Sequence, residues 1–257
     1  MLSDEQPIRD SNCPNKSSGI GEWPPSLFRL VLGAVFAAVL SFIVLKTMVP
    51  IFVVPLEIAT LPEQSPIWIY ERYERASYEV DGKNFSIVFG VIGAILGASC
   101  VLFSFGARSF KSIVIAAIGA GGLGAAGAFM SNWMFNNMRV NSGKNAMILG
   151  VSLDGMTQSI IGYSLLWGLI GLGVGVGVGS NRSVFKALVA GVSGFCGGVL
   201  GAILYVFLTA QISIGTVMNQ VYPLGDTSQA VWLALFTIVV AVCIALGSGE
   251  KKRQGAA

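Results

Sequence analysis

The chain has 257 residues, of which 54% are hydrophobic and only 11% are charged, with a formal net charge of +3. Ordinary soluble domains carry roughly 25% charged residues, so this composition cannot supply a water-facing surface and excludes a soluble protein. The chain has no histidine, which excludes imidazole acid–base catalysis, histidine metal sites and nucleophiles activated by histidine.

Apolar runs divide the chain into membrane spans. A helix needs about 20 mostly apolar residues to cross a bilayer, and we predict six spans, at 27–49, 84–105, 110–135, 159–179, 184–208 and 230–248. The fold class predicted is therefore all-α, a polytopic transmembrane helical bundle. The polar tail 1–26 does not resemble a secretion signal, so the first span is expected to be a retained anchor.

The loop at 50–83 is predicted to lie outside the membrane and to contain a short helix. Ser65 is a candidate N-cap, Pro66 suits the first helical position, and Asp81-Gly82 is a stop signal. We interpret this as a helix on the outer membrane face, in a solvated connector whose aromatic residues lie at the membrane boundary. The alternative is a surface for a partner or ligand. The external-surface residues predicted here and in the outer loop 136–158 are Trp68, Glu71 and Asp154.

Glycines concentrate in two predicted hairpins, at 84–135 and 159–208, whose turns read "GARSFKS" and "SNRSVFKA". A shift of 75 residues places Lys111 on Lys186 and Gly119 on Gly194. We interpret the hairpins as a repeat. Because each unit holds two spans, the copies would have the same orientation and form a parallel repeat.

The first hairpin contains G-x-G-x-x-G at Gly119, Gly121 and Gly124. A dinucleotide site needs an acidic residue about 20 residues further on, and 140–150 has none. We therefore interpret the pattern as a small-residue helix face that allows close helix packing. In the fourth span, glycines on two nearly opposite faces predict a helix at the centre of the bundle. The predicted helix-packing residues are Gly119, Gly124, Gly171, Gly175, Gly179, Gly194 and Gly198.

Basic residues in the short loops predict the orientation. With six spans, the loops after spans two and four and the tail 249–257 lie on one side, whereas 136–158 and the third external loop, 209–229, lie on the other. The excess of lysine and arginine predicts that both termini are cytoplasmic in a cell membrane, although Arg139 and Lys144 oppose it. The topology-determining residues are Arg108, Lys111, Arg182, Lys186, Lys251, Lys252 and Arg253.

The segment at about 163–205, which contains "LLWGLIGLGVGVGVGSNRSVFKALVAGVSGFCGGVLGAILY", has an echo at 89–129. It resembles glycine-rich membrane hairpins of uncharacterised bacterial multi-span proteins, a type sometimes found beside phosphopeptide-binding FHA modules. No FHA module is present in this chain. The resemblance implies no activity and no functional residues.

Ionisable groups inside spans mark most charge-coupled transporters, and spans two to six have none away from their ends. Lys46 lies near the end of span one and is expected to snorkel. The leading hypothesis is a non-enzymatic scaffold or assembly component. Alternatives are a channel or carrier for a neutral or small solute, and thirdly a membrane enzyme using Glu71 or Asp154. The expected partners are the lipid bilayer and other membrane proteins, with no nucleic acid, metal or cofactor.

Overall fold

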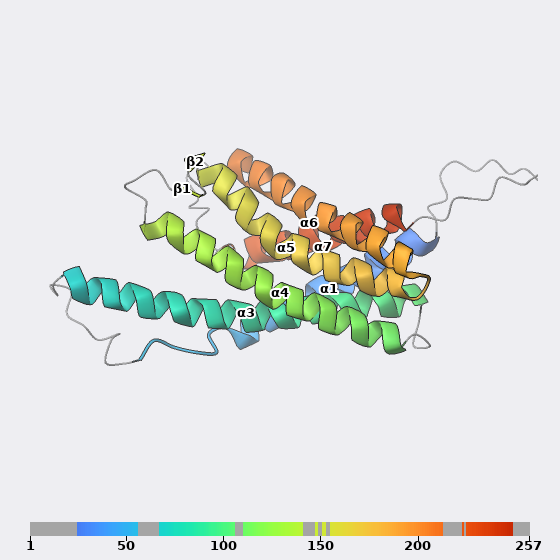
Figure 1. The fold of residues 1–257 in the computed structure, drawn as a ribbon, viewed down its shortest axis with the longest axis horizontal. Helices are drawn as coiled ribbons and strands as arrows, with labels where there is room; N and C mark the ends of the chain where they lie inside the picture. The colour runs from blue at the N-terminus through green and yellow to red at the C-terminus, as the bar shows by residue number, and fades with distance from the viewer. Residues whose placement is uncertain are drawn as a thin grey trace, which may run out of the picture.

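The computed structural model describes residues 25–55, 67–105, 110–140, 147–148, 151–152, 155–212, 223 and 225–248. Each of the long helices in these ranges is apolar enough to cross a membrane, and they number six. The predicted all-α, six-span architecture is therefore confirmed, and the chain is an integral membrane protein. The helices (Figure 1) are α1 (Pro25–Met48), α3 (Ile67–Phe105), α4 (Phe110–Val140), α5 (Gly155–Ser180), α6 (Val184–Ile212) and α7 (Asp226–Gly247).

The connection between α4 and α5 is shorter than the predicted loop 136–158. α4 continues to Val140 and α5 begins at Gly155. Between them, β1 (Met147–Ile148) and β2 (Val151–Ser152) pair antiparallel as a two-stranded ribbon. The loop therefore contains regular structure that its sequence did not indicate.

α3 corrects the prediction for residues 50–83. The predicted short surface helix ending at Asp81-Gly82 is wrong, because Ile67–Phe105 is one continuous helix of 39 residues. A glycine inside a helix costs only about 1 kcal/mol relative to alanine. At Gly82 its bare Cα also makes room for α4, because an added Cβ atom would lie 3.1 Å from Asn132 Nδ2. The stop signal is thus overridden by packing.

The length of α3 makes it project from the bundle. At about 1.5 Å per residue, a helix of this length measures roughly 58 Å, whereas the hydrocarbon core of a bilayer is about 30 Å thick. Figure 1 shows its first turns extending beyond the other helices. The start of α3 therefore stands clear of its neighbours.

α5 occupies the centre of the bundle. It packs against α3, α4, α6 and α7, and α1 lies against α3 and α7. In its most apolar window 61% of the residues are buried, the largest share among the spans described. The central position predicted from its glycines is confirmed.

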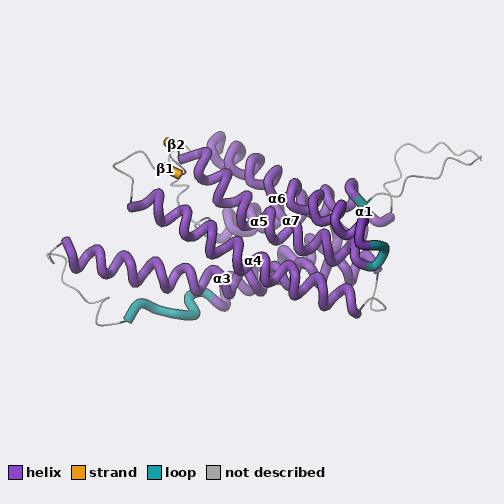
Figure 2. The backbone as a smooth tube through the Cα atoms, in the orientation of Figure 1, coloured by secondary structure: helices purple, strands orange, loops and turns teal. Residues whose placement is uncertain are grey.

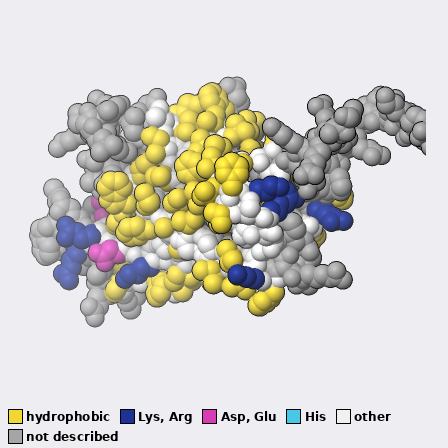
Figure 3. Space-filling view, turned by 45° about the vertical axis from the view of Figure 1, so that its right-hand side comes forward, with side chains coloured by type: hydrophobic (Ala, Val, Ile, Leu, Met, Phe, Trp, Pro, Cys, Tyr) yellow, Lys and Arg dark blue, Asp and Glu magenta, His cyan; other side chains and the backbone are white. Residues whose placement is uncertain are grey.

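Side-chain contacts define the two ends of the bundle. At the "basic end", Ser112 at the start of α4 donates a hydrogen bond to Asn181, which follows α5. Arg182 Nη1 donates to Ser248 O, after α7, at 2.9 Å. At the opposite "far end", Lys46 of α1 meets Asp226 of α7. In Figure 3, apolar side chains cover much of the middle of the visible face, and lysine and arginine lie mainly toward its two sides.

Candidate functional sites

One face of α5, carrying Gly171, Gly175 and Gly179, packs directly on the backbone of α6. A Cβ atom added at Gly171 would lie 2.7 Å from Gly194 C, and one at Gly175 would lie 2.5 Å from Ala190 C. Backbone atoms cannot rotate away as a side chain can, so these positions accept no side chain without moving a helix. The two helices are therefore in contact at the level of their main chains.

The opposite face of α5 makes the same kind of contact with α4. A Cβ atom added at Gly173 would lie 2.5 Å from Ala120 Cα, and one at Gly177 would lie 2.6 Å from Ala116 Cα. Residues two apart on a helix are separated by about 200°, which explains how one helix has two such faces. α4, α5 and α6 thus form a layer held by backbone contacts, which we call the glycine layer.

The α3–α4 hairpin also has close contacts. An added Cβ atom at Gly97 would lie 2.5 Å from Ala116 O, and one at Gly124 would lie 2.5 Å from Phe89 O. Gly119 is less tightly packed, because a Cβ atom there would lie 3.9 Å from Gly173 O.

The 75-residue shift relates two pairs of neighbouring residues. Gly93 and Ala120 are neighbours in the first hairpin, and the equivalent Gly168 and Phe195 are neighbours in the second. A Cβ atom at Gly93 would lie 2.9 Å from Ala120 C, and one at Gly168 would lie 2.9 Å from Phe195 Cε2. The first contact involves backbone and the second a phenyl ring. The second hairpin makes its backbone contact at Gly171 instead. The two hairpins thus bring equivalent positions into contact, but their helices approach each other most closely at different places.

The G-x-G-x-x-G pattern lies inside a helix. α4 is unbroken from Phe110 to Val140 and passes through all three glycines. A phosphate-binding turn needs these glycines between a strand and a helix. Gly121 and Gly124 face the carbonyls of α3 instead, as expected of helix packing.

Aromatic side chains fill the interior toward the far end. Trp167 of α5 stacks on Phe236 of α7 with ring centroids 4.9 Å apart, and Trp232 meets Trp167 edge-on at 5.3 Å. Tyr163 meets Tyr205 of α6 edge-on at 5.5 Å. This aromatic cluster consists of Phe89, Phe135, Tyr163, Trp167, Tyr205, Trp232 and Phe236.

Sequence reasoning missed this cluster, although a signal was available. Tyr163 and Trp167 are four residues apart, as are Trp232 and Phe236, so each pair shares one helix face. The sequence does not show that these faces meet. That meeting depends on close packing, because Gly198 of α6 lies against the backbone of α5 at Trp167.

Within the described part of the chain, three buried polar atoms in and beside the aromatic cluster have no hydrogen-bond partner. They are Trp167 Nε1, Trp232 Nε1 and Gln229 Oε1. The amide nitrogen of Gln229 is satisfied, since it donates to Pro223 O at 3.0 Å. An unsatisfied buried group costs about 1–3 kcal/mol, so a hydrogen-bonding partner at any of these atoms would be stabilising.

At the far end, Lys46 lies 2.5 Å from Asp226 and over the ring of Phe42, with 5.5 Å between Nζ and the ring centroid. The sequence predicts snorkelling for Lys46 but not this partner, which is 180 residues away. The pair links the last turn of α1 to the first turn of α7, and Asp226 suits the positive end of that helix.

The predicted topology and surface residues are placed as follows. Lys111, Arg182 and Lys186 are exposed and lie at the basic end. Trp68 and Glu71 lie in the projecting start of α3, with side chains outside the described set. Arg108, Asp154, Lys251, Lys252 and Arg253 lie outside the described residues.

Among the described residues, no group of three or more histidine, cysteine, aspartate or glutamate side chains could hold a metal ion. Compared with protein-family models, curated proteins and solved structures, the chain matches none of them. The resemblance to glycine-rich bacterial hairpins thus stays a prediction.

Proposed function

We propose that this integral membrane protein is a non-enzymatic scaffold or assembly component that acts through close helix packing. The observation that supports it is the glycine layer, in which α5 contacts both neighbours through backbone atoms. Backbone contacts offer no alternative rotamers, so the layer resists sliding and reorganisation. Such a layer is suited to holding other components in fixed positions.

The projecting start of α3 is the surface that would meet a partner. Arg72, Arg75 and Glu79 are all exposed there, and their spacing places them along one side of the helix. A partner with complementary charge could bind this side without disturbing the bundle.

In-cell cross-linking followed by purification tests this proposal. The full chain carrying Arg72→Glu and Arg75→Glu should lose its cross-linked partner, whereas the control Thr227→Glu with Ser228→Glu, at the start of α7, should keep it. Both variants change exposed residues, so folding should be unaffected. An identical set of cross-links in all three chains would contradict the proposal.

A channel or carrier for a neutral or small solute is the second candidate. The unpartnered atoms of Trp167, Trp232 and Gln229 favour it, because buried hydrogen-bonding groups can replace the water around a solute. Flux of uncharged solutes into proteoliposomes separates the two functions. A scaffold should give the permeability of protein-free vesicles; selective flux that falls in Trp232→Phe would establish the carrier.

We further propose that both termini face the cytoplasm of a cell membrane. Support comes from Lys111, Arg182 and Lys186 lying at the same end of the bundle, which is the bias expected of cytoplasmic loops.

A further inference from the structure

Residues 50–55 leave α1 and run along the outside of α3 without forming a helix (Figure 2). Such a backbone cannot enter hydrocarbon unless protein groups satisfy its N–H and C=O groups. The question is therefore what replaces water around this segment at the edge of the bilayer.

Asn84 of α3 supplies hydrogen bonds to the backbone of residues 51 and 52. Its Oδ1 accepts from Phe52 N at 2.8 Å and from Ile51 N at 3.2 Å, and its Nδ2 donates to Phe52 O at 2.9 Å. Asn84 is itself only 3% exposed, so these bonds do not depend on solvent. A single side chain thus fixes the segment against the helix.

Held in this way, the segment presents apolar side chains outward. Ile51, Phe52 and Val53 are 40%, 43% and 72% exposed. The segment follows directly after α1, whose last turn holds the Lys46–Asp226 pair, so it lies at the level where the helices leave the hydrocarbon.

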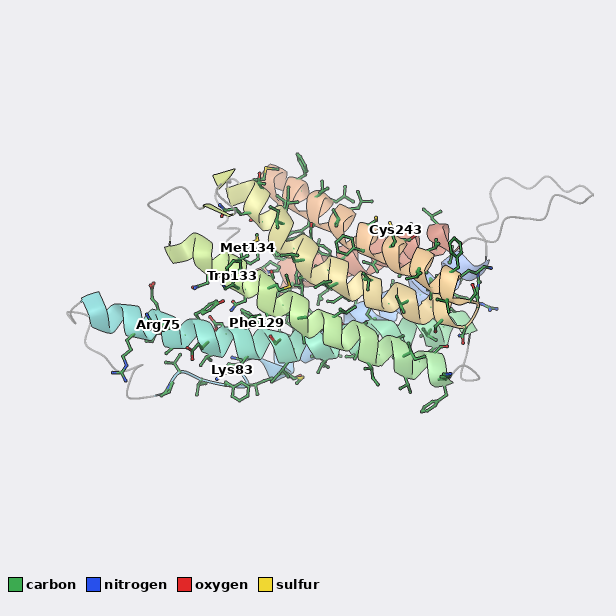
Figure 4. All side chains as sticks on the ribbon, viewed as in Figure 1. Arg75, Lys83, Phe129, Trp133, Met134 and Cys243 are labelled. Atoms are coloured by element: carbon green, nitrogen blue, oxygen red, sulfur yellow. The ribbon has the colours of Figure 1, made fainter. Side chains whose placement is uncertain are left out.

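Basic side chains border the same segment. Lys83 is exposed and adjacent in sequence to Asn84, and Figure 4 shows it on the side of α3 along which residues 50–55 run. Arg75 lies about two turns further out and is also exposed. Glu79 lies between them, so the face carries an excess of positive charge.

We propose that residues 50–55, Lys83 and Arg75 form a binding site for an anionic phospholipid. Phe52 and Val53 enter the boundary between headgroups and acyl chains, and Lys83 binds the lipid phosphate. Apolar side chains beside basic ones are the combination by which interfacial elements bind anionic membranes. Arg75 lies about 12 Å further along the helix, so it adds only a weaker attraction that salt screens.

A nitroxide at position 53 tests the depth of the segment. The full chain, with its native cysteines replaced and Val53→Cys labelled, is reconstituted in phosphatidylcholine vesicles with or without phosphatidylglycerol. The label should be more accessible to oxygen than to a water-soluble nickel chelate, and more so with phosphatidylglycerol. A label at Glu79→Cys should show the reverse preference. Asn84→Ala should free the label at 53 and remove the difference between the lipids.

Spin-labelled lipids test the charge. The protein should prefer labelled phosphatidylglycerol over labelled phosphatidylcholine, and Lys83→Gln should weaken that preference about fivefold. Glu79→Gln is the matched control, because it changes one charge on the same face in the opposite direction and should strengthen the preference.

Three results would overturn the proposal. They are equal effects of Lys83→Gln and Glu79→Gln, an aqueous environment at position 53 in both lipid mixtures, or full displacement of labelled phosphatidylglycerol by inorganic phosphate. The last would identify a site for free phosphate instead of a lipid.

Discussion

Glycine acts in this bundle mainly as a contact residue. Among the described residues only Gly225, with a φ of 92°, has a backbone conformation that favours glycine. Gly171, Gly173 and Gly175 sit in regular helix, and what distinguishes them is the neighbouring backbone against their Cα atoms. Their replacement should therefore act through steric overlap, and not through loss of flexibility.

Gly175→Ala should destabilise the protein by about 2 kcal/mol, because the added methyl group overlaps the backbone of Ala190 and overpacking typically costs 1–3 kcal/mol. Gly122→Ala is the matched control, since a Cβ atom at Gly122 has no atom of the described residues within 4 Å and alanine favours helix. Unfolding in a mild detergent titrated with a denaturing one gives both values. Equal stabilities for the two variants would contradict the glycine layer.

The contact faces of α5 could be predicted from glycine spacing alone, because glycines two apart must lie on nearly opposite sides of a helix. The aromatic cluster and the Lys46–Asp226 pair could not, since each depends on which helices become neighbours in three dimensions. At Asp81-Gly82 the local signal pointed the wrong way, because contact with α4 outweighed the cost of one glycine in a helix. Nearly all of the helices could be predicted from the sequence, but few of the side-chain contacts inside the bundle could be.

At the level of elements, the continuity of α3 sets how far it projects. Lys83→Pro measures that continuity. If the helix passes through this position, proline removes a backbone hydrogen bond and clashes with the Glu79 carbonyl, which costs about 3 kcal/mol or more. Lys83→Ala should leave stability almost unchanged, because alanine is a good helix former. Similar unfolding free energies for the two variants would indicate a helix break before position 83.

The Lys46–Asp226 pair joins α1 to α7. Their side chains are 38% and 78% exposed, so the pair is screened by solvent. A double-mutant cycle with Lys46→Gln and Asp226→Asn should give a coupling free energy of about 0.5–1 kcal/mol that shrinks as salt is added. A coupling that salt does not change would mean that the two groups interact by something other than charge.

For the whole molecule, orientation decides which end meets which compartment. In intact cells, an impermeant maleimide should label Glu79→Cys and fail to label Asn181→Cys, in a background without native cysteines. Both positions are exposed and lie at opposite ends of the bundle. Permeabilised cells should give equal labelling and so serve as the control. The reverse pattern would place the termini outside.

Because so many residues of α5 are glycines, the helix has few side chains to contact lipid. This affects how the chain enters the membrane during synthesis. The apolar window of α5 has a mean hydropathy of 1.8, the lowest among the spans described, because each glycine contributes almost no surface for lipid to cover. Part of the free energy that keeps α5 in the bilayer then comes from the helices beside it, because 61% of the residues in its apolar window are buried. We expect the insertion of α5 to depend on α4, which is synthesised earlier and lies next to the translocation site. We expect insertion to be complete only after α6 has been synthesised.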